Sequence, residues 1–143
     1  MSNVTTRATF VSAPPDKVAA VITDLESYPS WQKEMQYVEI LTKDDQSRPV
    51  KVRFDISAMG QEASYTAVFS YPEEGVIESH LLEGDMITKQ DQRYVLSPTN
   101  DGTEVSYTLE LDVKWQVPDV MLKAIINKGI KTNLDGIKKR SET

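Results

Sequence analysis

The sequence predicts an α+β fold in which a curved antiparallel sheet closes over one long C-terminal helix around an apolar cavity. Two observations carry this prediction. Apolar residues recur with helical spacing near both ends of the chain, and they alternate with polar residues over most of the sequence between. The 143 residues suit a single domain spanning positions 1–143. An antiparallel sheet with helices gathered on one face is an α+β arrangement.

A first strand is predicted at residues 5–12, which are rich in β-branched side chains. The sequence does not decide which face of this strand points into the core, because Ala8 with Phe10 and Thr9 with Val11 both make plausible apolar sets. The strand is therefore assigned to the sheet with both orientations open.

Two short helices follow this strand. Pro14 and Pro15 end the strand and suit the first turn of a helix that begins near Asp16. Its apolar positions keep helical spacing: Val18, Ala19, Val21, Ile22 and Leu25. The residues at 24–29 end this helix, and those at 29–31 predict one more short helical turn.

Six further strands are predicted between Tyr37 and Trp115, where the hydrophobic period changes to two. Turns at 59–62 and 97–102 are short, so consecutive strands form an antiparallel meander with one face toward water. The predicted strands cover residues 37–42, 50–58, 65–71, 76–83, 86–96 and 105–115.

A long final helix is predicted at residues 118–141, about 35 Å in length. Pro118 and Asp119 suit its first turn. The stripe at i, i+3, i+4 spacing consists of Leu122, Ile125, Ile126, Gly129, Ile130, Asn133, Leu134 and Ile137. Only this element is long enough to cover the inner face of a seven-stranded sheet.

The strand at 86–96 carries an unusual pattern. Thr88, Gln90 and Gln92 share a face with Tyr94 and Leu96, although that face should point inward. Two explanations remain open: a β-bulge shifts the register of this strand, or its polar side chains offer hydrogen bonds to a ligand.

Composition excludes several kinds of function. The net charge of −6 argues against a nucleic-acid partner, and the chain has no cysteine for disulfides or thiolate metal sites. His80 is the one histidine and should face solvent by alternation, so no catalytic triad, metal site or cofactor is expected. Acidic pairs such as Glu73-Glu74 fall in predicted loops, so they are not expected to be catalytic.

Without a signal sequence or membrane span, a cytoplasmic monomer or weak dimer is expected.

Several motifs distributed along the chain resemble those of a known superfamily. They are Val11-x-Ala13-Pro14, Asp24-x-x-x-Tyr28-Pro29-x-Trp31, Leu81-x-x-Gly84, Tyr94-x-Leu96-x-Pro98 and Gly102-Thr103-x-Val105-x-Tyr107. On these residues the chain resembles the START-like, birch-pollen-allergen-like (SRPBCC) superfamily. Within it, the chain is most similar to the bacterial polyketide cyclase/dehydrase and coenzyme Q-binding START group. The resemblance implies a helix-grip fold. Ser79 is a departure, because relatives often carry a bulky side chain there.

The resemblance implies that the cavity binds a hydrophobic small molecule such as a lipid, an isoprenoid or quinone, or a polyketide-like compound. The scarcity of acid/base groups in the sequence favours binding without transformation. The alternative is a polyketide aromatase/cyclase or dehydratase that uses the cavity tyrosines. The residues expected at the cavity are Trp31, Phe54, Tyr65, Phe69, Ser79, Leu81, Gln92, Tyr94, Tyr107, Leu109, Ile126, Ile130 and Asn133. For Trp31, a structural role that plugs one end of the sheet is the other interpretation.

Overall fold

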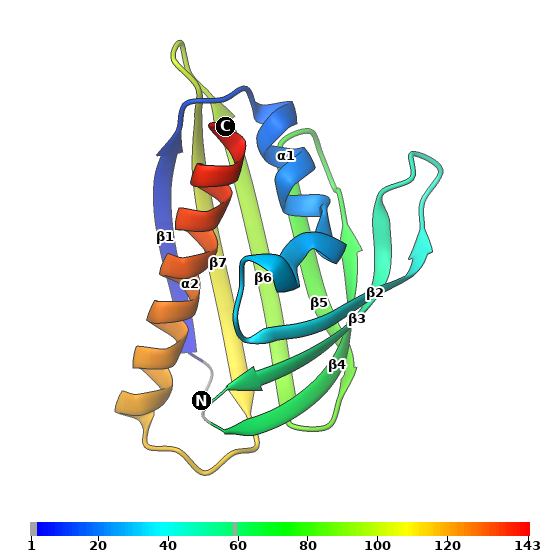
Figure 1. The fold of residues 1–143 in the computed structure, drawn as a ribbon, viewed down its shortest axis with the longest axis vertical. Coiled ribbons are helices and arrows are strands. Elements are labelled where there is room, and N and C mark those ends of the chain that lie inside the picture. The colour runs from blue at the N-terminus through cyan, green and yellow to red at the C-terminus, as the bar shows by residue number, and fades with distance from the viewer. Residues whose placement is uncertain (1–2, 59) are drawn as a thin grey trace.

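The computed structural model describes residues 3–58 and 60–143 and confirms the α+β, helix-grip prediction (Figure 1). Seven strands form one antiparallel sheet in the order β1-β7-β6-β5-β4-β3-β2. The strands are β1 (Asn3–Val11), β2 (Met35–Lys43), β3 (Pro49–Ala58), β4 (Gln61–Ser70), β5 (Val76–Gly84), β6 (Ile87–Pro98) and β7 (Thr103–Val113). The helices are α1 (Pro15–Thr23), the 3₁₀ helix η1 (Leu25–Ser30) and α2 (Asp119–Ser141). Met59, in the predicted turn at 59–62, lies outside the described residues.

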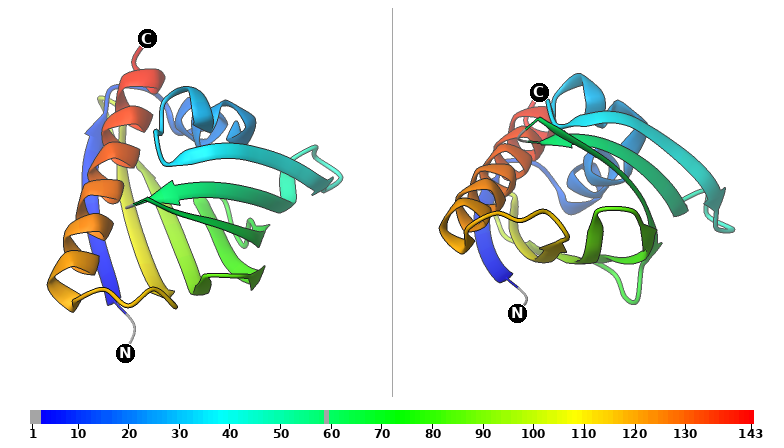
Figure 2. Two further views of the ribbon diagram at one scale, coloured as in Figure 1. Left: turned by 60° about the horizontal axis from the view of Figure 1, so that its bottom comes forward. Right: turned by 90° about the horizontal axis from the view of Figure 1, so that it is seen from below.

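The sheet curves strongly, and α2 lies along its concave side (Figure 2). Seen from below, the strands run from β1, which lies beside α2, around the cavity side to β3 and β2, which return with one end toward the C-terminal half of α2. Helix α2 buries most of the apolar stripe that its sequence predicts, including Ile126, Ile130 and Ile137, whereas Ile125 is half-buried and Gly129 is exposed. None of the helices in the described residues combines the length and apolarity needed to cross a membrane.

The N-terminal helices close one end of this curved sheet. Pro14 is extended and Pro15 occupies the first turn of α1, which buries Val18 and Ile22 against the core. Helix η1 follows directly, and its Tyr28 donates a hydrogen bond of 2.6 Å to the carbonyl oxygen of Ile22. This bond holds η1 against the end of α1.

The first strand turns Thr9 and Val11 inward. Val11 is fully buried, whereas Phe10 keeps 39% of its surface exposed. The strand pairs with β7 so that Val11 lies opposite Thr103. Arg7, on the same face as Val11, donates a hydrogen bond to Asn127 of α2. Of the two possible faces, the one containing Val11 is thus the one that meets the helix.

A register shift in β6 resolves part of the polar pattern. The pairing of β6 with β7 is irregular between Ile87 and Lys89, so Ile87 is buried and Thr88 is exposed. Beyond this bulge the alternation resumes, and Gln90, Gln92 and Tyr94 face inward. The expectation for Thr88 was wrong, because the extra residue at the bulge reverses the face on which the strand begins.

Candidate ligand-binding cavity

A cavity of about 210 Å³ lies between the concave face of the sheet, η1 and α2. This is larger than the roughly 150 Å³ apolar void that holds benzene in a protein core. Most of the predicted site residues contribute to its wall: Phe54, Tyr65, Gln92, Tyr94, Tyr107, Leu109, Ile126, Ile130 and Asn133. Strands β3, β4, β6 and β7 and one face of α2 therefore meet around a single space.

Trp31 does not belong to this wall. Its ring packs against Gly136 of α2, where a side chain on that glycine would overlap the indole. The ring centroid of Tyr28 lies 4.9 Å away, and the guanidinium carbon of Arg140 lies 5.7 Å from the ring centroid of Trp31. Because Trp31 is held against the C-terminal half of the helix, it seals the fold next to the cavity instead of lining it.

Phe69, Ser79 and Leu81 also lie outside the wall. Phe69 is buried, with its ring 6.3 Å from that of Phe54, which does reach the cavity. Ser79 is fully buried, and Gln90 occupies the wall position beside it. Leu81 is half-buried, lies opposite Ala67 of β4 and contacts the surroundings of Gly84. Phe69 and Ser79 are thus buried residues outside the cavity, whereas Leu81 belongs neither to the cavity wall nor to the buried core.

Sequence reasoning missed the part of the wall formed by η1 and the segment after it. Leu25 and Tyr28 of η1, followed by Gln32 and Met35, contribute to the cavity. The Asp-x-x-x-Tyr-Pro-x-Trp motif was the sequence feature that pointed to this region, and it was interpreted as supporting the fold and not the cavity. Which of its side chains turn toward the cavity depends on how η1 docks on the sheet, which periodicity does not encode.

Two groups of hydrogen bonds lie in the cavity wall, one that joins the segment after η1, α2 and the sheet, and one within the sheet. Gln32 donates a hydrogen bond of 2.8 Å to Asn133, and Asn133 donates one of 2.7 Å to the Tyr94 hydroxyl. The Tyr107 hydroxyl donates a hydrogen bond of 2.7 Å to Gln92. The buried amide of Asn133 thus finds partners on both sides, as an interior amide must.

Tyr65 differs from the other cavity tyrosines. Its ring stacks on Phe54 with centroids 5.0 Å apart. Its hydroxyl makes no hydrogen bond to any described residue, whereas the hydroxyls of Tyr28 and Tyr107 donate to acceptors of the protein. Since Tyr65 lines the cavity, its hydroxyl is free to donate to a molecule inside it.

Burial keeps the cavity phenols protonated. It raises the pKa of Tyr94 to about 12, although the hydrogen bond from Asn133 acts in the opposite direction. Burial also raises the pKa of Tyr65 and, together with the nearby Tyr94, that of Tyr107. At neutral pH these groups are neutral hydrogen-bonding side chains and do not act as bases.

Among the described wall residues, only Glu34 has an ionisable carboxyl, and it is exposed at the rim. The described residues contain no cluster of three or more histidine or carboxylate side chains placed to hold a metal ion. The cavity therefore presents apolar groups, neutral amides and phenols to whatever occupies it.

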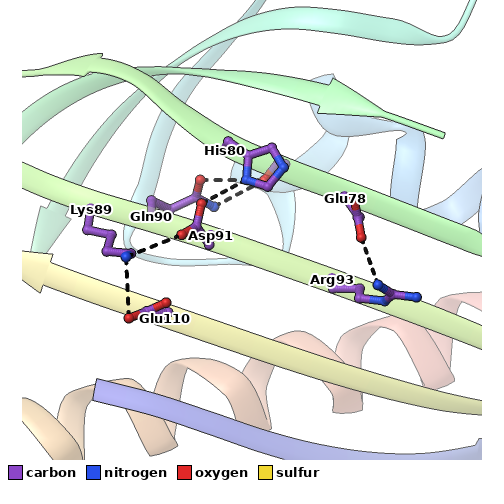
Figure 3. A network of polar contacts seen from close by, with 8 residues as sticks. Glu78, His80, Lys89, Gln90, Asp91, Arg93 and Glu110 are labelled. Carbon is purple, nitrogen blue, oxygen red and sulfur yellow. Dashed lines mark hydrogen bonds and ion pairs between the residues drawn. The ribbon is translucent and has the colours of Figure 1, made fainter. Parts of the chain in front are cut away.

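The histidine and most nearby charges lie on the opposite face of the sheet (Figure 3). His80 is exposed, as alternation predicts, and its Nδ1 lies 2.8 Å from Asp91. Lys89 bridges Asp91 and Glu110 across β6 and β7. Between Lys89 and Asp91, Gln90 turns inward and donates a hydrogen bond of 3.2 Å to Ser79. The charged network stays outside, and only the uncharged amide reaches the cavity.

A strongly curved antiparallel sheet, a long helix across it and an apolar cavity between them define the helix-grip class of proteins. The chain belongs to the family described as polyketide cyclase/dehydrase and lipid transport, because the family model matches residues 1–142. The START-like resemblance is thereby confirmed. No curated protein matches the sequence significantly.

Solved structures of similar shape support this assignment. A START superfamily protein from Mycobacterium smegmatis is 28% identical, with a TM-score of 0.86 and 97% of each chain covered. The Zhui aromatase/cyclase from Streptomyces sp. R1128 is 18% identical, with a TM-score of 0.83, and the match covers 99% of this chain and 94% of the other. A protein from Thermus thermophilus is 20% identical, with a TM-score of 0.78 and 97% of each chain covered. At these lower identities the last two show the fold alone.

Proposed function

We propose that this protein binds an uncharged, largely apolar small molecule that carries at least one oxygen atom, and that it does so without transforming it. A lipid, an isoprenoid or quinone, or a polyketide-like compound would have this chemistry. The observation that carries the proposal is the wall of the cavity, in which the inner polar groups are all neutral and the rest is apolar.

The charge of the ligand follows from the wall. A buried charge without a partner is strongly unfavourable, and no described residue inside the rim supplies a counter-ion. An apolar body would fit against side chains such as Leu109, Ile126 and Ile130. An oxygen of the ligand would accept a hydrogen bond from Tyr65, whose hydroxyl has no acceptor among the described residues.

The alternative is a cyclase or dehydratase, which the family description includes. Tyr65, Tyr94 and Tyr107 would then hold a poly-keto chain and promote its enolisation. Enolisation also needs a general base to remove a proton from carbon, and inside the rim the described wall residues include no carboxylate or imidazole for this step. Binding without turnover therefore agrees better with the site. Loss of poly-keto turnover on Tyr94→Phe and Tyr107→Phe would favour the enzymatic alternative.

Titration with 1-aminoanthracene, a neutral aromatic fluorophore, tests the proposal. The unmodified protein should bind the probe at one site with an increase in emission. Leu109→Trp places a large ring in the cavity and should weaken binding by about tenfold or more. Thr88→Trp, on the exposed side of the neighbouring strand, is the matched control and should bind normally. Equal binding by both variants would show that the probe sits elsewhere and would refute the proposal.

A further inference from the structure

Two glycines of α2 lie in opposite surroundings. At Gly136 an added Cβ would overlap the ring of Trp31, so this glycine permits close packing. At Gly129 an added Cβ would meet no atom within 4 Å. Gly129 is nevertheless part of the cavity wall, and it is exposed to solvent. A wall residue that is both exposed and without a side chain marks a place where the cavity reaches the surface.

The segment after η1 explains why the wall opens at this height. Trp31 packs on Gly136, and Gln32 is hydrogen-bonded to Asn133, three residues earlier in the helix. The segment and the helix are thus joined along the C-terminal half of α2. Gly129 lies one turn further toward the N-terminus of α2, about 6 Å beyond Asn133 along the axis. At Gly129 the helix therefore has no side chain that could contact the segment after η1.

The two sides of this opening can be assigned from the wall residues. On α2, Ile125 and Thr132 lie on the same side as Gly129, at i−4 and i+3, and both are half-buried wall residues. Glu34 and Met35 also belong to the wall, and they follow Gln32, which is hydrogen-bonded to Asn133 one turn of α2 away from Gly129. Glu34 and Gly129 are the exposed members of the wall, as expected for the two lips of one slot.

We propose that small molecules enter and leave the cavity sideways, through the slot between α2 and the start of β2, and that Gly129 keeps this slot open. The inference builds on the proposed function, because a route of exchange matters only for a cavity that takes up a molecule. Glycine in the middle of a helix lowers helix stability relative to alanine. Packing does not require a glycine at 129, because a side chain would have room there. An access route for small molecules does require a small residue at this position.

The absence of cysteine from the chain allows a direct test. Leu109→Cys places a single thiol on the cavity wall, and Thr88→Cys places one on the outer face of the sheet. The rate at which N-ethylmaleimide, a small neutral reagent, modifies each thiol reports access from solvent. Both reporters are compared in proteins that carry Gly129, Gly129→Ala, Gly129→Leu or Gly129→Trp.

The proposal predicts graded slowing at Leu109→Cys as the side chain at 129 grows, reaching about tenfold or more with Trp. Thr88→Cys should react at one rate throughout. If Gly129→Trp unfolds the protein, both thiols react quickly and the Gly129→Leu protein decides. Equal rates at Leu109→Cys in all folded variants would overturn the proposal, as would a Leu109→Cys thiol that does not react when Gly129 is present.

This experiment is separable from the test of the proposed function. If the protein binds no 1-aminoanthracene but shows graded labelling, the slot is supported and the proposed ligand class is refuted. If it binds the probe in the cavity but labels at equal rates, the proposed function is supported and the slot is refuted.

Discussion

At the scale of single residues, the cavity tyrosines differ in where their hydroxyl protons go. Tyr28 donates to a backbone carbonyl and Tyr107 to Gln92, whereas Tyr65 has no acceptor among the described residues. A phenol that is already satisfied stabilises the fold, while an unsatisfied one is available to a ligand. The wall therefore contains phenols that are bonded within the fold and one, Tyr65, whose hydroxyl we propose for a ligand.

Tyr65→Phe should weaken the binding of oxygenated ligands and leave hydrocarbons unaffected. Competition against 1-aminoanthracene would compare 1,4-naphthoquinone with naphthalene. Loss of one hydrogen bond should raise the dissociation constant of the quinone by about five- to tenfold. Tyr71→Phe is the control, because the Tyr71 hydroxyl donates to Pro49 outside the cavity. An unchanged preference for the quinone in Tyr65→Phe would remove Tyr65 from the proposed contact.

Asn133 links the segment after η1 to the sheet. Asn133→Leu leaves Gln32 and Tyr94 without their amide partner and should lower the free energy of unfolding by about 1–3 kcal/mol. Urea unfolding followed by circular dichroism would measure this change. Lys128→Leu, at an exposed position of the same helix that makes no hydrogen bond or ion pair to a described residue, should cost no more than about 0.5 kcal/mol. Equal costs at both positions would contradict the role assigned to Asn133.

The raised pKa of Tyr94 predicts how stability changes in alkali. In the unfolded chain a tyrosine ionises near pH 10, whereas in the fold the Tyr94 pKa is about 12. The folded state therefore holds the proton of Tyr94 more tightly, and below pH 10 the contribution of this group to the free energy of unfolding does not change. Between pH 10 and 12 the free energy of unfolding falls by roughly 3 kcal/mol because of this group. Urea midpoints in that window should fall less for Tyr94→Phe than for the unmodified protein; parallel curves would contradict this.

At the scale of elements, the two glycines of α2 predict opposite effects of the same substitution. Gly129→Ala should raise the free energy of unfolding by about 0.5–1 kcal/mol, because alanine favours the helix and has room there. Gly136→Ala should lower it by about 1–3 kcal/mol, because the methyl group displaces Trp31. Thermal unfolding of the two variants checks both signs, and stabilisation by Gly136→Ala would contradict the packing described for Trp31.

Strand β6 shows where sequence periodicity stopped being informative. The alternation predicted inward positions for Gln90, Gln92 and Tyr94, and the structure has them there. It failed at Thr88, because a bulge near Ile87 adds a residue that a strict period of two does not count. The β-bulge explains Thr88, whereas the inward Gln90 and Gln92 bond to Ser79 and Tyr107 within the protein, and their contact with a ligand stays a prediction.

For the whole molecule, the order of elements and the change of period were sufficient to predict the fold. They also identified most of the wall on β6, β7 and α2, because one face of each element is apolar. They did not identify Leu25, Tyr28 and Met35 as wall residues. Those positions depend on the docking of η1 over the end of the sheet, a long-range contact that local patterns do not contain. Of the two interpretations of Trp31, the structural one agrees with its packing on Gly136.

The central claim is that the cavity holds an uncharged, oxygenated apolar molecule. Native mass spectrometry tests it most directly, on protein that has been incubated with a total lipid extract and separated from free compounds. The account predicts a one-to-one complex whose added mass leaves on organic extraction and belongs to a neutral compound with at least one oxygen. Protein that emerges empty, or that retains only charged compounds, would contradict the account.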